Sequence, residues 1–293
     1  MLAAKAGLRA GTVTKVAFSL AMAALGVGLQ HMFSDLWPAL CERVGATLAT
    51  TVMCGFIPAS FYWGNSLLIG WRTGWNDQSS PRKLQPGKGP ARENYFDGAP
   101  LVLLNTLVIG PGLTLIAEPM WGASWQWWGF ASAEARFAQV PDALTFLGSM
   151  VIFLLVEEVG FYYGHRLAHH PSLYSWVHKP HHTYTAPVAY AAVYAHPLEH
   201  IVVNVAPVIA GPVLLASHPA TAAAWICLAL IYTTNSHCGY FLVPYVSPEG
   251  HDWHHEVFNE NYGVLGILDS LHGTDTRYKE AMRRRDKAAA TSK

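Results

Sequence analysis

Long runs of uncharged, mostly apolar residues constrain the fold of this chain more than any other feature. A helix needs about 20 such residues to cross a bilayer, with a range of roughly 17 to 25. Four runs approach or exceed this length: Val16–Phe33, Val44–Trp71, Ala99–Ala117, and Ala143–Val156, which continues through two glutamates to Gly164. We therefore expect four long transmembrane helices, with a candidate kink at Pro58.

A fifth uncharged run, Ile201–Asn235, is too long for one span. As a single straight helix it would extend about 52 Å at 1.5 Å per residue. Gly211-Pro212 and His218-Pro219 interrupt it. We expect a short membrane hairpin with arms Ile201–Ala216 and Ala220–Asn235, either full-length or re-entrant.

The basic residues are distributed unevenly between the segments that connect these runs. Four connecting segments hold 17 of the 19 Lys and Arg: 1–15, 72–98, 164–200 and 236–293. The other two connecting segments, 34–43 and 118–142, hold only Arg43 and Arg136. Cytosolic loops carry the excess of Lys and Arg, so we expect the four basic segments in the cytosol and the aromatic stretch Trp121–Trp128 at the opposite interface. Two distant parts of the chain, 165–200 and 237–272, then share the cytosolic face.

Composition excludes several classes of protein. Only 13% of residues are charged and 52% are hydrophobic, with a formal net charge of zero, so the chain is not disordered. A pI near 7.3 argues against nucleic-acid binding through bulk charge. Alternatives to the membrane interpretation are a soluble helical protein with a large core, or a signal peptide over Met1–Phe33. The cysteines Cys41, Cys54, Cys227 and Cys238 form no CxxC pair and predict neither a disulfide framework nor a cysteine zinc site.

Histidine is the unusual residue type, and 14 of the 15 histidines lie between His165 and His272. They form three boxes with spacings HxxxHH, HxxHH and HxxHH: His165, His169 and His170; His178, His181 and His182; and His251, His254 and His255. Residues three and four apart share a helix face, so each box can point at one spot, although Pro180 must start or distort a helix.

Neutral imidazole is the commonest metal ligand near physiological pH. Nine imidazoles exceed the three or four that one zinc ion takes, and they suffice for two metal ions with open positions. The alternative uses of clustered histidine are a pH sensor and a proton relay. The isolated His31, His218 and His272 are interpreted as ordinary hydrogen-bonded residues.

The three boxes, in this order, resemble the fatty acid hydroxylase/sterol desaturase superfamily of membrane di-iron enzymes, and most closely the C4-methylsterol monooxygenases. The resemblance covers about residues 157–278. Its further motifs are Glu157-Glu158 ahead of His165-Arg166, Thr185-Ala-Pro187, Tyr194-Ala-His-Pro-Leu-Glu199, His237-Cys-Gly-Tyr240 and Gly273-Thr-Asp275.

The resemblance implies a site of two iron ions, O2 as the oxidant, and electrons from cytochrome b5 or a similar carrier. Residue by residue, it implies these ligands: His165, His169, His170, His178, His181, His182, His237, His251, His254 and His255. The count is nine or ten, because some relatives have a second histidine four residues before His237, where this chain has Thr233.

Further residues are expected to support the ligands, because a ligating histidine usually donates its other N–H to a carboxylate or carbonyl. The candidates are Glu157, Glu158, Glu199, Asp252 and Asp269, together with His196, whose other interpretation is a helix start. The chain has neither a GxGxxG after a strand nor a CxxCH, so the reductant must arrive on a partner. The basic tail Arg277–Lys287 can steer an acidic carrier or contact anionic lipid.

The sequence therefore predicts an all-α integral membrane bundle of four long transmembrane helices plus a short hairpin, with a cytosolic helical cap that carries a histidine-rich di-metal site. The expected regions are a transmembrane region 1–142, a catalytic region 143–280 and a basic tail 281–293. No nucleic-acid partner is expected.

The predicted activity is hydroxylation of an unactivated C–H bond of a lipid, with the C4 methyl of a sterol precursor as the specific expectation. The expected location is the endoplasmic reticulum, with the boxes facing the cytosol. Alternatives are a fatty-acyl or sphingoid hydroxylase, a sterol desaturase, a membrane zinc hydrolase, and, from a different class, a metal or proton transporter.

Overall fold

The computed structural model describes residues 12–130, 140–242 and 248–291. These residues form helices and connecting turns with no β-strand, and one isolated bridge pairs Lys83 with Tyr240. Four of the described helices are long and apolar enough to cross a membrane: Ala46–Arg72, Arg92–Trp127, Ala143–Ala168 and Pro197–Leu214. The all-α membrane fold is thereby confirmed, although only three of these four correspond to the predicted long spans, and Pro197–Leu214 is the first arm of the predicted hairpin.

The first helix is longer than predicted. Helix α2 (Thr12–Val44) contains the expected span Val16–Phe33 and continues through 34–43, which we expected to be a loop. The break comes at Gly45, whose φ of 80° suits glycine because other residues meet a steric penalty there.

Three of the spans change helical register within the membrane region. In the first of these spans, the π-helical segment η1 (Val52–Phe56) lies between α3 (Ala46–Thr51) and α4 (Ile57–Arg72). In the second, η3 (Asn105–Ile109) lies between α5 (Ala99–Leu104) and α6 (Gly110–Trp127). In the third, η6 (His200–Val205) lies between α10 (Pro197–Glu199) and α11 (Ala206–Leu214). Each segment ends two residues before a proline: Pro58, Pro111 and Pro207. Proline has no N–H for the carbonyl four residues earlier, and a local π turn is one way to satisfy that carbonyl in a membrane. The candidate kink at Pro58 thus takes the form of a π segment.

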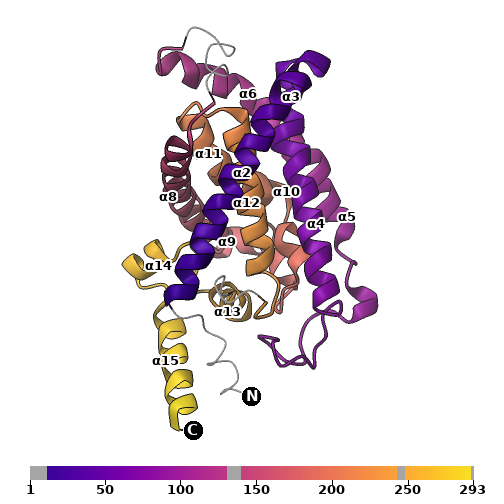
Figure 1. Cartoon of the computed structure of the whole chain (residues 1–293). Helices are drawn as coiled ribbons and strands as arrows, with labels where there is room; N and C mark the ends of the chain where they lie inside the picture. Colours follow the sequence, from indigo (N-terminus) through magenta and orange to yellow (C-terminus); the bar gives the residue numbers. More distant parts are fainter. Residues whose placement is uncertain (1–11, 131–139, 243–247, 292–293) are drawn as a thin grey trace.

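Helix α12 (Pro219–Ser236), the second arm of the predicted hairpin, is the central helix of the bundle. It packs against α2 and α4, and Figure 1 shows it behind α2. Its first half is alanine-rich and buried, and small side chains let neighbouring helices approach closely. The hairpin turns at His218-Pro219 as expected, whereas Pro212 lies inside α11.

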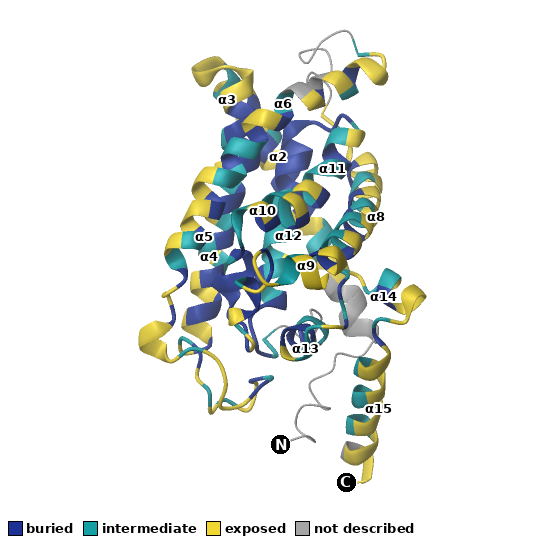
Figure 2. Cartoon of the chain, turned by 180° about the vertical axis from the view of Figure 1, so that it is seen from behind, coloured by how far each residue is buried: buried dark blue, intermediate teal, exposed yellow. Residues whose placement is uncertain are grey.

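The outer surface of the bundle is apolar. Helix α8 (Ala143–Ala168) exposes Leu144, Val151 and Leu155 on its outer face, and Figure 2 shows the exposed residues of α8 turned away from the other helices. The expected aromatic belt is only partly present at the surface. Trp121 and Trp125 are buried in the core, because α6 continues to Trp127, which is 88% exposed.

The cap lies at one end of the bundle (Figure 1). It contains the short segments α9 (Pro171–Tyr174), η4 (His181–Thr183) and η5 (Ala189–Val193), and the helices α13 (Glu249–Val257), α14 (Ile267–His272) and α15 (Thr276–Thr291). The connection 73–98, with η2 (Arg92–Asn94), lies at the same end. The described parts of the predicted cytosolic segments therefore share one end of the molecule.

Candidate metal centre

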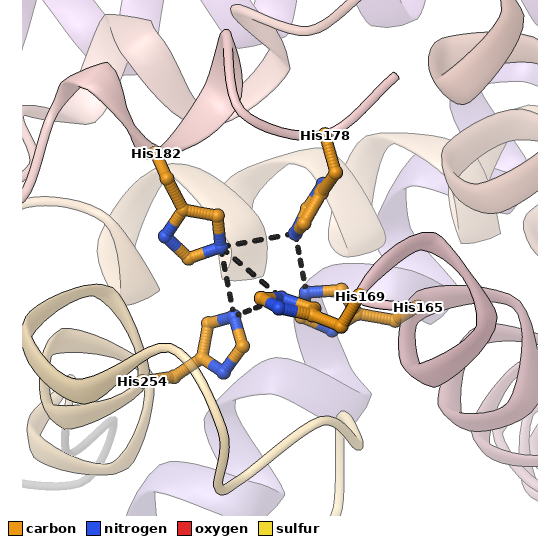
Figure 3. A group of neighbouring side chains, drawn as sticks. All are labelled: His165, His169, His178, His182 and His254. Atoms are coloured by element: carbon orange, nitrogen blue, oxygen red, sulfur yellow. Dashed lines mark hydrogen bonds between the residues drawn. The ribbon is translucent and has the colours of Figure 1, made fainter. Parts of the chain in front are cut away.

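Nine histidine rings converge between the bundle and the cap. Histidine group 1 contains His165, His169, His178, His182 and His254, and histidine group 2 contains His181, His237, His251 and His255. Within each group, one ring nitrogen from every residue lies within 4.8 Å of the others. Figure 3 shows the rings of group 1 turned toward one another.

The facing atoms are Nε2 nitrogens at close spacing. In group 1, Nε2 of His178 lies 3.1 Å from Nε2 of His165 and 3.0 Å from Nε2 of His182. In group 2, Nε2 of His251 lies 2.8 Å from Nε2 of His237. Bonds from imidazole nitrogen to a zinc-sized ion are about 2.0–2.1 Å long, so two ligands at right angles lie about 3 Å apart. The spacing fits one metal ion in each group.

The second and third boxes are each divided between the groups. Histidines four residues apart stay together: His165 with His169, His178 with His182, and His251 with His255. His181 and His254 fall in the other group from the rest of their boxes. This differs from our expectation that a whole box faces one spot. Consecutive helical residues differ by about 100° around the axis, so one box can serve two ions.

The opposite nitrogen of the ring, Nδ1, is held by a backbone carbonyl in four residues. His165 donates to Tyr262 (2.8 Å), His254 to Glu260 (2.7 Å), His181 to Tyr194 (3.1 Å) and His237 to Thr233 (2.9 Å). A neutral imidazole carries one proton, so these bonds leave Nε2 with a lone pair that faces the centre of the group. Converging lone pairs are the donor set that a metal cation requires.

Glu199 holds a fifth histidine. Its Oε1 accepts a hydrogen bond of 2.6 Å from Nδ1 of His178, and both side chains are buried. This is the carboxylate–histidine arrangement that orients metal ligands and raises their basicity.

Two other predicted carboxylates act through a loop. Glu158 accepts backbone N–H bonds of 2.7–3.0 Å from residues 264, 265 and 268. Asp269 accepts from the N–H groups of Tyr262 and Gly263. A Cβ at Gly263 would lie 2.9 Å from Asp269 Oδ2, so the loop needs glycine there. Because the carbonyl of Tyr262 holds His165, both carboxylates support group 1 indirectly.

The remaining carboxylates lie farther from the ligands. Asp252 accepts from Nε2 of Gln85 at 3.1 Å, and the same nitrogen reaches the carbonyl of Thr185 at 2.8 Å. These contacts join α13 to the connection 73–98. Glu157 is buried and lies on the wall of two cavities beside the histidine groups.

His170 and His196 both begin helices. Nδ1 of His170 accepts from the N–H of Ser172 at the start of α9, and Nδ1 of His196 accepts from Leu198 at the start of α10. His218 does the same at the start of α12. Each is followed by proline, which suits the first helical position. The structure thus places His170 outside both histidine groups.

Burial keeps the clustered histidines neutral. Desolvation, together with neighbouring imidazoles, lowers the pKa of His169 to about 2 and that of His237 to about 3. Desolvation lowers the pKa of His181 to about 4. Desolvation and the neighbouring imidazoles also hold the pKa of His254 well below its usual value. Neutral imidazole is the form that binds metal.

An apolar cavity opens onto both groups. His165 and His178 of group 1 line it, as do His181, His237 and His251 of group 2. It extends between the membrane helices, and all three π-helical segments contribute to its wall. Such a cavity suits an alkyl or ring hydrocarbon.

A second and more polar cavity approaches group 2 from the cap. It lies between α12 and residues 261–279, and it shares Glu157, Phe161, His237 and His251 with the apolar cavity. The histidine groups are therefore bordered by an apolar space on the membrane side and by a polar space on the cap side.

Sequence reasoning missed several residues that hold the ligands. Tyr194, Thr233, Glu260 and Tyr262 act through backbone carbonyls, which any residue type can supply. The side chain of Glu260 gave a weak signal, as a charged residue five positions after the third box. It is buried and accepts from the backbone of Arg277 and Tyr278.

Comparison with known proteins agrees with this geometry. The model of the fatty acid hydroxylase family matches residues 150–274. The human protein named fatty acid hydroxylase domain-containing protein 2 is 42% identical over 228 residues, which are 76% of this chain and 66% of that protein. The chain thus spans just under two thirds of that relative's length.

Two further relatives carry names that mention sterols. A putative methylsterol monooxygenase of Dictyostelium discoideum is 31% identical over 72% of this chain and 78% of its own. A C-4 methylsterol oxidase of Schizosaccharomyces pombe is 29% identical over 69% of each chain. No solved structure matches the chain. The family match and these relatives confirm the resemblance carried by the histidine boxes, and the chain belongs to the fatty acid hydroxylase/sterol desaturase superfamily.

Proposed function

We propose that this protein is a membrane-bound non-haem di-iron monooxygenase that hydroxylates an unactivated C–H bond of a lipid. One observation carries the proposal: two groups of neutral histidines open onto one apolar cavity between membrane helices. Membership of the superfamily supports oxygen-dependent oxidation as the reaction class.

The proposed ligands are the nine residues of the two histidine groups. Imidazole suits iron, zinc, copper and nickel, and the family match favours iron among them. When bound, a pair of irons supplies the activation of O2 that no side chain can perform.

The protein's own residues position the lipid and the histidines and keep water out of the apolar cavity. The apolar cavity takes the lipid from between the helices and keeps water away from the carbon that reacts, along a wall that includes Val203, Ile209 and Ile226. Tyr262, Glu260 and Glu199 fix the orientation of the histidines. The polar cavity gives protons and water a separate approach from the cap.

The specific substrate we propose is a sterol precursor oxidised at its C4 methyl group. The names of two relatives and the Tyr194–Glu199 motif support this choice. Fatty-acyl or sphingoid hydroxylation and sterol desaturation are the alternatives within the superfamily.

The electron donor we propose is cytochrome b5 or a similar acidic carrier. Helix α15 presents exposed basic side chains at the cap end, among them Arg277, Lys279 and Arg284. Opposite charge on a carrier would increase its rate of encounter with this end. We propose the endoplasmic reticulum as the location and the cytosol as the side of the cap.

Metal analysis of the purified protein tests the di-iron proposal. We expect about two irons per chain, and loss of iron from His181→Ala, which removes one ligand of group 2, and from His254→Ala, which removes one ligand of group 1. His31→Ala is the matched control, because His31 is exposed on α2. Iron-free protein that retains full oxygenase activity, or zinc at one ion per chain, would contradict the proposal.

Turnover with defined lipids tests the substrate. With a reductase chain and O2, 4,4-dimethylsterol should gain one oxygen atom at a C4 methyl, as detected by mass spectrometry. Turnover of an acyl or sphingoid lipid without sterol oxidation would favour the alternative substrates. Metal or proton flux into sealed vesicles, with no oxidised product, would favour a transporter.

A further inference from the structure

Three buried polar atoms on the wall of the apolar cavity have no hydrogen-bond partner among the described residues. They are Oδ1 of Asn105, Oε2 of Glu199 and Nδ1 of His200. All three residues line the cavity, and they are 0%, 2% and 5% exposed. A buried polar atom without a partner is costly, so three that line one cavity indicate a ligand.

The surrounding contacts make the unpartnered atoms of Asn105 and His200 hydrogen-bond acceptors. Nδ1 of His200 has no partner, and the backbone of Asn105 interacts with the same ring, so the other ring nitrogen can carry the proton and leave Nδ1 with a lone pair. The amide nitrogen of Asn105 donates to the carbonyls of Val193 (2.8 Å) and Ala195 (2.9 Å). These two bonds assign the unpartnered atom as the amide oxygen.

Glu199 links these acceptors to the metal centre. Its Oε1 accepts from His178 of group 1 at 2.6 Å, while Oε2 is the unpartnered atom. Asn105 and His200 are also the first residues of η3 and η6. Local π-helical turns frequently occur at functional sites, and here two of them bring polar residues to one wall.

We propose that Asn105, Glu199 and His200 form a subsite that accepts a hydrogen bond from the hydroxyl group of a lipid alcohol. An ether, an ester or a hydrocarbon has no proton to donate and leaves every acceptor unpaired. The hydroxyl serves one acceptor directly, and a water or a second hydroxyl serves the others. The hydroxyl end of the lipid, and not the far end of its hydrocarbon, then lies beside group 1.

The subsite deepens the proposed function by naming a lipid alcohol as the substrate class. It rests on the proposed function only for the question of which bond of that lipid is oxidised. Binding itself can be measured without turnover, on the full-length metal-loaded protein in lipid nanodiscs, without O2 and reductant. The probes are cholestanol and its 3-methyl ether, in which a methyl group replaces the hydroxyl proton, so the ether has no hydrogen to donate.

We expect the wild-type protein to bind cholestanol about 3- to 10-fold more tightly than the ether, as one hydrogen bond predicts. His200→Leu should reduce this preference, because one of the three acceptors, Nδ1, is lost. Thr114→Val is the matched control in the same cavity, since the Thr114 hydroxyl already donates to the carbonyl of Gly110. It should keep the preference.

Equal affinity of the wild-type protein for alcohol and ether would overturn the subsite, and this comparison needs no variant to fold. Retention of the full preference in His200→Leu would remove His200 from it. A hydroxyl preference without any oxidised product leaves the subsite in place and counts against the oxygenase. Oxidation of lipids without any preference for a hydroxyl group supports the oxygenase and counts against the subsite.

Discussion

At the level of single residues, the tautomer of each imidazole sets the character of the two histidine groups. Carbonyl and carboxylate acceptors hold the Nδ1 proton in five of the nine residues. The nitrogens that face one another are then acceptors, and a cation relieves their repulsion. Helix starts use His170, His196 and His218 in the opposite way, because there Nδ1 is itself the acceptor.

The position of His170 leads to a test of the ligand count. Because its Nδ1 accepts from Ser172 and it lies outside both groups, His170→Asn should retain the full iron content. Asparagine preserves the helix start, since it is also a favoured N-cap residue. Metal analysis of the variant checks this, and loss of iron would restore the ten-ligand interpretation.

Lys83 is a fully buried cation in the connection 73–98. Its Nζ donates to Oδ1 of Asn76 at 2.5 Å and lies 4.6 Å from the centre of the Tyr240 ring. Burial lowers the pKa of Lys83 to about 8, against the attraction of Asp252. The unfolded chain therefore binds a proton more readily than the folded chain between about pH 8 and 10.5.

This difference predicts that the protein gains stability as the pH rises from about 8 to 10.5. The gain is at most about 3 kcal/mol for a shift of this size. Lys83→Met should lack it, so thermal unfolding in detergent, followed across this pH range, should show a rise in Tm for the wild type relative to the variant. Parallel pH profiles for the two proteins would contradict the assignment.

The sequence was sufficient to predict which histidines lie at the site, but not which of them contact one another. The spacing of the boxes identified eight of the nine clustered histidines, the family resemblance added His237, and the carboxylate rule identified Glu199. The division of the boxes between two groups depends on how α13 and the turn at 178–182 are oriented. Sequence spacing does not contain that orientation, nor the carbonyl contacts of Tyr262 and Glu260.

At the level of elements, the prolines explain why the spans are irregular. Each of the three π-helical segments ends two residues before a proline, and each contributes to the apolar cavity. Hydropathy located these spans, because burial in lipid requires only apolar length. It could not locate the end of α2, which continues past its charged residues to Gly45, or the burial of Trp121 and Trp125.

Helix α15 is attached to the rest of the cap at its first turn and again at Arg285, which pairs with Glu249 of α13. The Glu260 carboxylate accepts from the N–H groups of Arg277 (2.8 Å) and Tyr278 (2.9 Å) and from Nε1 of Trp253 (3.1 Å). The carbonyl of the same residue holds His254. One residue thus connects the basic helix with group 1.

Loss of this attachment should loosen α15. Glu260→Ala removes three accepted hydrogen bonds and should destabilise the cap by about 2–4 kcal/mol. Limited trypsin digestion should then cleave α15 at its basic residues faster than in the wild type. Glu280→Ala is the matched control, since Glu280 makes an exposed pair with Arg284 and should change stability by less than about 0.5 kcal/mol. Equal cleavage rates for the two variants would refute the role of Glu260.

At the level of the whole molecule, the chain has two unlike ends. One holds the histidine groups, the connection 73–98 and α15, and the other holds the turn at Gly45 and the end of α6 (Figure 1). The positive-inside rule predicts that the first end faces the cytosol.

Labelling of single cysteines in sealed vesicles tests this topology. In a Cys41→Ser background, Lys88→Cys and Lys287→Cys should react with an impermeant maleimide from the same side, because both positions are exposed at the cap end. Trp127→Cys, at the exposed end of α6, should react only from the other side. Reaction of all three from one side would exclude a membrane between these ends.

The division of the boxes has a consequence for how the chain is held together. All four cysteines are free. Metal ions in the two groups would therefore serve as cross-links, which tie the end of α8, the turn at 178–182, the end of α12 and α13 into one closed ring of chain. Two of these segments are bound by both ions, so the first ion to bind fixes most of the second site. Loading of the pair should then be cooperative, and a single loss should release both.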